Sequence, residues 1–337
     1  MNSRQETSGG SSATLEWIRA QPKAELHLHL LGAIRPRTAL ELAERHRVGF
    51  PLRSEREWVP FFSAGDLSAF VTAFTALFDL LRTKEDFERV AREVFQDLAA
   101  DGIAYAEPRI TLTSHLSRGV ALGALVEGLS AARVFARAEW NLEIGWIVDF
   151  PRVLGREVGE RALQEAMAGR EWGVVGFDIA GYEGSFGDES YLVDLFRRAR
   201  ESGLGTTAHA GEIGSSARVR TAVEDWKVDR IGHGIQAAGD TEVMRLLAEN
   251  RIPLEIAPTS NLLLGVVDSL ESHPIEILRR AGVPVTVNTD DPSLFGTTLS
   301  RELRSVAETF RWSWEVVEEV ISNAWEFRFA RPGLNSR

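Results

Sequence analysis

The stretch VVGFDIAGYEGSFGDESYLVDLFRRARESGLGTTAHAGE (174–212) has the pattern of a strand, a helix and a second strand. Its first run, VVGFDIAG (174–181), and its last, GTTAHAGE (205–212), are short and rich in small or β-branched residues, as buried strands are. Between them, apolar residues recur at helical spacing: Leu192, Leu195, Phe196 and Ala199. A helix between two buried strands is typical of a crossover in a parallel sheet.

Eight strand-like runs of this kind occur along the chain. They are AELHLHLLG (24–32), IAYAEPRIT (103–111), EIGWIVDF (143–150), VVGFDIAG (174–181), GTTAHAGE (205–212), RIGHG (230–234), PLEIAPTSN (253–261) and PVTVNTDD (284–291). Helical periodicity separates them, most clearly over 67–81 and 87–98. Eight alternating units predict an α/β fold that closes into a (β/α)8 TIM barrel. A Rossmann sheet is the competing interpretation, but LGAI (31–34) is not the glycine-rich phosphate loop that it requires.

The predicted domain organisation is simple. Residues 14–331 are expected to form a single domain, because no linker, low-complexity tract or repeat interrupts them. The Ser/Gly-rich residues 1–13 are expected to be disordered, and residues 332–337 to be a frayed tail. The interval from about 50 to 82 exceeds one crossover helix. We therefore expect extra helices after the first strand, inserted as a lid over the barrel mouth.

Composition restricts the possible sites and partners. The chain has 337 residues and no cysteine, which excludes disulfides, thiolate metal sites, iron–sulfur clusters and a cysteine nucleophile. The net charge of −11 argues against nucleic acid and anionic membrane surfaces as main partners. The sequence has neither an apolar run as long as a membrane span nor the apolar core of a signal peptide, so we expect a cytoplasmic protein.

Ionisable residues gather where the predicted strands end, which is the face on which barrels place their active sites. His27 and His29 are two residues apart, so both side chains point to the same side of the first strand. Later runs end in HAGE (209–212), HG (233–234) and DD (290–291). The three imidazoles of His27, His29 and His209, together with the carboxylate of Asp290, form a donor set that suits zinc, with Fe²⁺ or Mn²⁺ as alternatives. An open position would hold a water, whose pKa zinc lowers to about 7. We expect Asp291 and His233 to lie beside this site.

Six motifs then occur in a specific order along the chain. They are KAELHLHLLGAIRP (23–36), FDIAG (177–181), HAGE (209–212), RIGHG (230–234), PLEIAPTSN (253–261) and HPIEILRRAGVPVTVNTDDPSLFGTTL (273–299). Through them the chain resembles the adenosine deaminase family of the amidohydrolase superfamily, over about residues 23–325. The resemblance implies hydrolytic, zinc-dependent removal of the 6-amino group of an adenine nucleoside, which gives a 6-oxopurine and ammonia.

The resemblance also implies a role for each matching residue. His27, His29, His209 and Asp290 correspond to the zinc ligands. Glu212 corresponds to the residue that donates a proton to purine N1, and a positioned acid helps there because attack at C6 pushes charge onto N1. His233 corresponds to the group that orients the attacking water and accepts its proton. Asp291 would bind purine N7, and the backbone amide of Gly181 would bind N3.

The sequence departs from the family pattern at two positions. Leu31 stands where adenosine deaminases usually have an aspartate that helps to hold the ribose 5′-hydroxyl, and leucine cannot accept that hydrogen bond. Tyr182 replaces the usual acidic residue after Gly181, and it could stack on the substrate or simply pack.

A third residue, Arg109, ends the second predicted strand. It could bind a substrate carboxylate or phosphate, or form a structural ion pair with Glu107 or Glu183. Together with Leu31, such an anchor favours a 5′-modified adenosine. An example is aminodeoxyfutalosine of menaquinone biosynthesis, whose 5′ extension is apolar and carries a carboxylate. Adenosine itself stays a candidate. Free adenine and N6-methyl-AMP rank lower, because the first motif lacks the glutamate usual in adenine deaminases and no basic cluster is available to bind a phosphate.

Two other classes of function compete with this interpretation. The same metal site could hydrolyse a lactone, an ester or a cyclic amide. Alternatively, the chain could be a binding protein on an inactive deaminase scaffold, although the intact set of ligands argues against that. The partner is expected to be a small purine nucleoside, and the sequence does not determine the oligomeric state.

Overall fold

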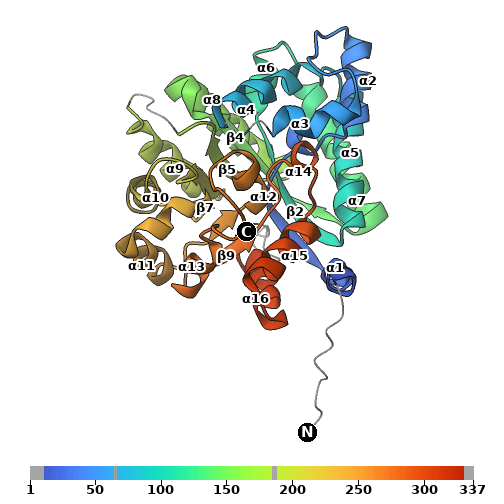
Figure 1. The fold of residues 1–337 in the computed structure, drawn as a ribbon. Coiled ribbons are helices and arrows are strands. Elements are labelled where there is room, and N and C mark those ends of the chain that lie inside the picture. The colour runs from blue at the N-terminus through green and yellow to red at the C-terminus, as the bar shows by residue number, and fades with distance from the viewer. Residues whose placement is uncertain (1–10, 64, 66, 184–187, 330–337) are drawn as a thin grey trace.

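The computed structural model describes residues 11–63, 65, 67–183 and 188–329 (Figure 1). Most of the segments expected to be disordered or frayed, namely residues 1–10 and 332–337, lie outside the described residues. Helix α1 (Ser11–Ala20) already begins inside the first of these segments, so regular structure starts earlier than the sequence suggests. The boundaries of a single domain therefore stay a prediction.

Eight parallel strands form the barrel, in the order β1-β2-β4-β5-β6-β7-β8-β9. Their bounds are β1 (Lys23–His29), β2 (Ile103–Ile110), β4 (Trp146–Pro151), β5 (Val174–Ala180), β6 (Gly205–Ala210), β7 (Arg230–His233), β8 (Leu254–Ile256) and β9 (Val285–Val287). A two-residue strand, β3 (Glu143–Ile144), pairs with β2 beside β4. The order of the strands follows the order of the sequence and confirms the predicted (β/α)8 TIM barrel.

The barrel closes where the segment after β9 meets β1. The backbone N–H of Asp290 donates to the carbonyl of His27 at 2.8 Å, and the N–H of His29 donates to the carbonyl of Asp290 at 2.8 Å. These two bonds form an isolated parallel bridge between Leu28 and Asp290. Candidate ligands from both ends of the chain thus meet at the closing seam.

Helices surround the strands (Figure 1). They are α2 (Pro36–His46), α3 (Trp58–Phe62), α4 (Leu67–Phe74), α5 (Lys84–Ala100), α6 (Leu112–Leu116), α7 (Leu122–Trp140), α8 (Gly155–Ala168), α9 (Tyr191–Glu201), α10 (Ser216–Thr221), α11 (Thr241–Glu249), α12 (Pro258–Leu263), α13 (Ile275–Arg280), α14 (Pro292–Phe295), α15 (Leu299–Phe310) and α16 (Trp314–Phe327). Short 3-10 helices are η1 (Leu31–Ala33), η2 (Glu55–Glu57), η3 (Thr75–Asp79), η4 (Arg152–Leu154), η5 (Gly169–Trp172) and η7 (Ile235–Gly239), and η6 (Ala222–Trp226) is a π-helix.

Helix α5 shows how the sequence pattern produces an outer helix. Thr83 caps its start by accepting a hydrogen bond from the N–H of Asp86, whose carboxylate accepts one from the N–H of Thr83 in return. Its apolar residues at helical spacing, including Phe87, Val90 and Val94, are buried against the barrel. The helices expected over 67–81, 87–98 and 192–199 are confirmed as α4 with η3, α5 and α9.

One predicted strand is too long. The run at 253–261 was expected to be extended throughout, but β8 ends at Ile256 and α12 begins at Pro258. Proline is well suited to the first turn of a helix, because its missing N–H would have no partner there. The polar end of this motif therefore lies on a helix that starts at the barrel rim.

The inserted helices after the first strand lie at the barrel mouth, as expected. Helix α4 contacts α14 through the rings of Phe70 and Phe295, whose centroids are 5.3 Å apart. The following turn, η3, contacts α6 through Phe78 and His115, with ring centroids 5.1 Å apart. The segment thus covers the strand ends that carry the candidate site.

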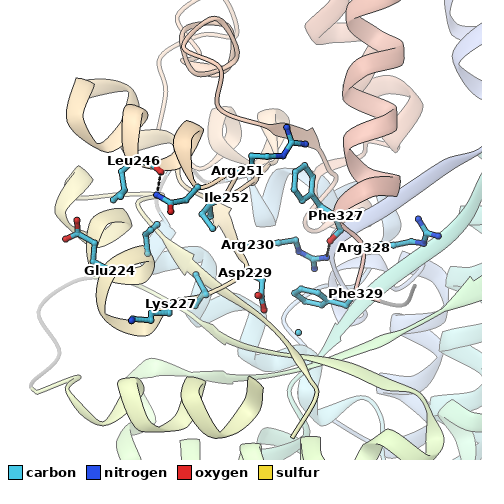
Figure 2. Close-up of a pocket in the computed structure, with 14 residues that line it drawn as sticks. Glu224, Lys227, Asp229, Arg230, Leu246, Arg251, Ile252, Phe327, Arg328 and Phe329 are labelled. Atoms are coloured by element: carbon cyan, nitrogen blue, oxygen red, sulfur yellow. Dashed lines mark hydrogen bonds between the residues drawn. The ribbon is translucent and has the colours of Figure 1, made fainter. Parts of the chain in front are cut away.

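The opposite end of the barrel is closed by a residue from beyond α16. The ring of Phe329 lies under the guanidinium of Arg230 at 3.6 Å, and its backbone N–H donates to Glu107 at 2.6 Å. A Cβ on Gly205 would lie 2.1 Å from this ring, so the start of β6 must be a glycine. Figure 2 shows Arg230 and Phe329 among the residues that line a surface cavity of about 780 Å³. Among the described residues, no helix combines the length and apolar character needed to cross a bilayer.

Candidate active site

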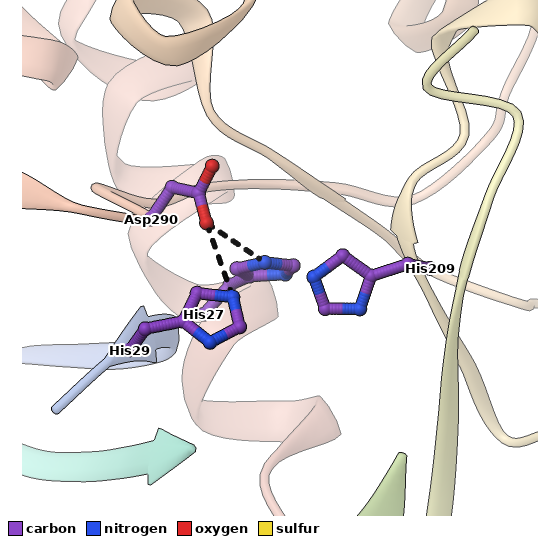
Figure 3. A group of neighbouring side chains, drawn as sticks. All are labelled: His27, His29, His209 and Asp290. Carbon is purple, nitrogen blue, oxygen red and sulfur yellow. Dashed lines mark ion pairs between the residues drawn. The ribbon is translucent and has the colours of Figure 1, made fainter. Parts of the chain in front are cut away.

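Four of the predicted site residues form one cluster at the carboxyl ends of the strands. A ligand atom from each of His27, His29, His209 and Asp290 lies within 4.8 Å of the others (Figure 3). The Nε2 atoms of His27 and His29 are 3.3 and 3.4 Å from Oδ1 of Asp290. Strand β1 carries the first two histidines, β6 the third, and the turn after β9 the aspartate. The side chains are therefore held by strands on both sides of the closing seam.

Each histidine of the cluster faces a buried carboxylate with its other ring nitrogen. His27 Nδ1 is 2.8 Å from Glu255, His209 Nδ1 is 3.1 Å from Asp178, and His29 Nδ1 is 3.6 Å from Asp149. The contact of His27 Nδ1 with Glu255 is a hydrogen bond, which favours the tautomer that leaves Nε2 free of a proton, as a metal ligand requires. His27 Nε2 is buried and has no hydrogen-bond partner. These donors fit a divalent cation, which would satisfy that nitrogen.

The backbone at this site is strained at two positions. Asp290 and His233 have φ angles of 60° and 61°, in the left-handed region that residues other than glycine rarely adopt. The carboxylate of Asp290 is also held by the hydroxyl of Ser260, which donates to Oδ2 at 2.7 Å. Strain of this kind persists only where surrounding contacts enforce it, and it is common at functional sites.

Two glycines create room for the site. A Cβ on Gly232 would lie 2.9 Å from the ring of His27. A Cβ on Gly32 would lie 1.7 Å from Oδ1 of Asp291. Both positions lie within the sequence motifs. Only glycine fits there, because the ring of His27 and the carboxylate of Asp291 occupy the space that a side chain would need.

Glu212, His233 and Asp291 surround the cluster and are all buried. His233 Nε2 is 3.8 Å from Glu212 Oε1 and 4.0 Å from Asp290 Oδ2. Oδ1 of Asp291 and Oε1 of Glu212 have no hydrogen-bond partner in the structure, so both are available to a ligand.

Burial shifts the pKa of each of these three groups toward its neutral form. It raises the pKa of Glu212 well above its ordinary value, and the carboxylates of Asp290 and Glu183 raise it further. The pKa of Asp291 is raised in the same way, first by burial and then by Asp290 and Glu212. Burial lowers the pKa of His233 well below its ordinary value. The site thus holds a carboxylic acid that can donate a proton beside an imidazole that can accept one.

Two residues outside the predicted site hold the turn that carries Glu212. The carboxylate of Glu183 accepts hydrogen bonds from the backbone N–H groups of Gly211 and Glu212, at 2.7 and 2.8 Å. The buried guanidinium of Arg152 donates to the carbonyl of His209 at 2.5 Å. Glu183 directly follows Gly181 and Tyr182 in the sequence. Its hydrogen bonds connect the segment after β5 with the turn after β6, and the sequence alone does not reveal such a long-range contact.

A cavity of about 330 Å³ opens above the cluster, and Gly181 is among its lining residues. Its lid side is apolar and is formed by Leu67, Phe70, Val71, Phe74 and Phe78. Arg118 is the one lysine or arginine among the described lining residues, and Ser114 and Ser117 lie near it in the chain. Its guanidinium is 3.2 Å from Asp79 in a pair that is partly exposed to solvent. The pattern of polar strand ends does not reveal Arg118, because this residue lies in the loop after α6.

Three predicted substrate contacts lie elsewhere. Arg109 does not line the cavity: its guanidinium is buried inside the barrel and bonds to Asp178, Glu255 and the carbonyl of Leu26. The expected substrate anchor is therefore wrong, whereas the alternative of a structural ion pair is confirmed with other partners, Asp178 and Glu255 in place of Glu107 or Glu183. Leu31 is also absent from the lining and packs in the core, because the chain turns into η1 after His29. Tyr182 is 38% exposed and outside the lining as well.

Comparison with known proteins gives concordant results. The family model described as adenosine deaminase matches residues 22–332. Over 315 residues, the chain is 36% identical to the aminodeoxyfutalosine deaminase of Streptomyces coelicolor, covering 93% of this chain and 81% of that protein. It is 34% identical to the adenosine deaminase of Mycobacterium ulcerans, covering 94% of this chain and 92% of the relative.

Solved structures agree with these sequence matches. The adenine deaminase of Arthrobacter aurescens superposes with a TM-score of 0.87 at 30% identity, covering 93% of this chain and 95% of that one. An amidohydrolase from Burkholderia ambifaria, solved with bound Zn, gives a TM-score of 0.86 at 26% identity, covering 97% of this chain and 91% of the other. The similarity therefore extends over nearly the whole barrel.

Proposed function

The chain belongs to the adenosine deaminase family and is a metal-dependent hydrolytic deaminase, and we propose that its substrate is an adenine nucleoside and its metal is zinc. In the proposed reaction, water adds to C6 of the purine, the C6–amino bond breaks, and the products are a 6-oxopurine and ammonia. His27, His29, His209 and Asp290 would hold the cation. When bound, zinc would supply an acidified water as nucleophile near neutral pH.

The protein's own groups would handle the protons and the purine ring. Glu212, kept protonated by burial and by neighbouring carboxylates, would donate a proton to N1 as charge develops there. His233, kept neutral by burial, would orient the attacking water and accept its proton. Asp291, whose raised pKa keeps it protonated, would donate a hydrogen bond to N7. Gly181 lines the cavity, where its backbone N–H is proposed to bind N3.

The cavity lining supports a 5′-modified nucleoside in particular. Five lid residues give it an apolar side, and Arg118 is its cationic group among the described residues. An apolar 5′ extension would contact Phe74 and Phe78, and a carboxylate at its end would bind Arg118. The pair with Asp79 is exposed, so a substrate anion can compete for the guanidinium. Aminodeoxyfutalosine has both features, and we propose it ahead of adenosine.

A side-by-side deamination assay with the zinc-loaded protein tests this proposal. The substrates are adenosine, 5′-deoxyadenosine, 5′-methylthioadenosine, aminodeoxyfutalosine, AMP and adenine. We expect aminodeoxyfutalosine to give the highest kcat/KM and 5′-methylthioadenosine to exceed adenosine. Preference for adenosine or adenine would reject the 5′-modified substrate while leaving the reaction intact. Absence of ammonia from every substrate would instead favour hydrolysis of a lactone, an ester or a cyclic amide.

The variant Arg118→Met separates binding of the substrate carboxylate from the apolar contacts of the 5′ extension. It should lower kcat/KM for aminodeoxyfutalosine by about 10-fold to 100-fold, the effect of losing one charge-assisted hydrogen bond or bidentate pair. The value for 5′-methylthioadenosine, which carries no anion, should change little and serves as the internal control. Equal losses for both substrates would show that Arg118 supports the cavity and does not bind the carboxylate.

A further inference from the structure

Arg109 is connected to two of the three histidines in the metal cluster through one shared carboxylate oxygen each. Its Nε lies 2.7 Å from Asp178 Oδ2, and the same oxygen lies 3.1 Å from His209 Nδ1. Its Nη2 lies 2.5 Å from Glu255 Oε2, and that oxygen lies 2.8 Å from His27 Nδ1. One guanidinium therefore sits at the centre of a continuous chain of polar contacts that ends at two candidate ligands.

The third nitrogen of the Arg109 guanidinium is also held by a hydrogen bond. Nη1 donates to the carbonyl of Leu26 at 2.9 Å, on the strand that carries His27. Starting from β2, the side chain thus reaches β1, β5 and β8 in the barrel interior. The side chains of Arg109, Asp178 and Glu255 are all fully buried, so no water competes for these contacts.

We propose that Arg109 is a positioning residue for the metal centre, which fixes the carboxylates of Asp178 and Glu255 and, through them, the tautomer and ring orientation of His209 and His27. The proposal concerns the metal site and holds for any of the candidate purine substrates. His29 provides an internal reference, because its carboxylate partner is Asp149, at 3.6 Å, and none of the side-chain hydrogen bonds of Arg109 reaches that carboxylate.

The chemistry of the guanidinium explains why arginine suits this position. Its donors form a rigid planar fork, so two carboxylates bound to it are held at a fixed separation and in fixed orientations. A lysine would supply the positive charge but only a compact ammonium group on a flexible stem. Removing the charge altogether would leave the buried carboxylate of Asp178 without an arginine partner and Glu255 with Arg230 alone. The lysine variant therefore separates the geometric contribution from that of charge alone.

The matched control is Arg230, which is equally buried and also forms two ion pairs. It contacts Glu255 through the other oxygen, Oε1, at 2.6 Å, and its second partner is Glu107. It touches neither of the two oxygens that face the histidines. Arg230→Lys should therefore perturb the barrel interior much as Arg109→Lys does, but of the two carboxylates it can loosen only Glu255, and it leaves Asp178 and His209 unchanged.

The experiment measures zinc affinity and metal-free stability separately on the full-length protein. Chelator competition gives the dissociation constant of Zn²⁺, and thermal unfolding of the metal-free protein reports the fold. We expect Arg109→Lys to weaken zinc binding by about 10-fold to 100-fold, the usual effect of losing a group that orients a metal ligand. Arg230→Lys, which reaches only Glu255 of the two carboxylates, should weaken zinc binding clearly less. Zinc affinity unaltered by Arg109→Lys, or lowered equally by both variants, would overturn the proposal.

Two NMR measurements on the metal-free protein test the geometry directly. Ring ¹⁵N shifts should show protonated Nδ1 on His27 and His209 in the unchanged chain, with Arg109→Lys altering these two rings and leaving His29 as it was. The second measurement uses only the unchanged protein and gives the rotation rate of the Arg109 guanidinium about its Nε–Cζ bond. This rotation should be slow, because three partners hold the group. Fast rotation in the unchanged protein would contradict a fixed fork and overturn the proposal.

Discussion

Replacing Gly32 by alanine should disable the site while leaving its metal ligands in place. The backbone of Gly32 lies outside the left-handed region, so alanine meets no conformational penalty there. The added Cβ would lie 1.7 Å from Asp291 Oδ1, whereas ordinary contact begins at 3.4 Å. The added Cβ would also lie 2.7 Å from Cβ of Asp291, so the buried side chain has to move as a whole, and its carboxylate by about 1.7 Å, to relieve the overlap. Misplacement by about 1 Å can lower a rate by about 10²-fold.

We therefore expect kcat/KM of Gly32→Ala to fall by about 10²-fold or more, which corresponds to about 2.7 kcal/mol of transition-state stabilisation. Zinc content should remain at the level of the unchanged protein, because Asp290 keeps its bonds to Ser260 and to the β1 backbone. Spectrophotometric deamination assays and elemental analysis of the same preparation give both numbers. Gly49→Ala is the control, since a Cβ there would meet nothing within 4 Å. Full activity of Gly32→Ala would refute the role assigned to Asp291.

Three further perturbations test other parts of the site and the fold. Glu212→Gln should retain zinc and substrate binding but lose about 10²-fold to 10⁴-fold in kcat. In the unchanged enzyme, kcat/KM should be constant between the lowered pKa of His233 and the raised pKa of Glu212, and should fall above the latter because Glu212 then loses its proton. Full turnover of the variant in a steady-state assay would exclude the proton-donor role. Asp290→Asn should lower the zinc content measured by elemental analysis, and an unchanged content would remove Asp290 from the ligand set. Burial between Phe78 and Phe87 lowers the pKa of His115 to about 3, below its unfolded value of about 6.5, so stability present above pH 6.5 is lost as pH falls toward 3, by roughly 5 kcal/mol in total. His115→Leu should reduce this acid-dependent loss in urea titrations across that range, and an identical pH slope in both proteins would contradict it.

The barrel and the metal cluster follow from the sequence because both depend on local patterns. Strand-like runs alternating with helices predict parallel strands, and the carboxyl ends of parallel strands share one face. The ionisable ends of the runs therefore had to meet, as His27, His209 and Asp290 do. The extra helices after β1 were also predictable, because the interval is too long for one crossover.

The carboxylate partners of the metal-cluster histidines could not be predicted from the sequence. They depend on how far each side chain lies from the barrel mouth and on the register between neighbouring strands. Asp178 and Glu255 are visible in the strand runs, but which histidine each one faces is set by how neighbouring strands are staggered. Arg109 is paired in register with His29, yet its long side chain extends into the barrel interior and not toward the mouth. Leu31 was assigned to a strand, whereas a turn immediately after His29 places it in the core.

The position of the closing seam makes activity depend on the order of synthesis. His27 and His29 leave the ribosome early, but Asp290 emerges only when β9 is complete, and the same residue both closes the barrel and completes the metal cluster. A nascent or truncated chain that ends before this residue lacks a ligand and a closed barrel at the same time. Deaminase activity should therefore appear only once translation has passed Asp290, and translation products that end before this residue should be inactive.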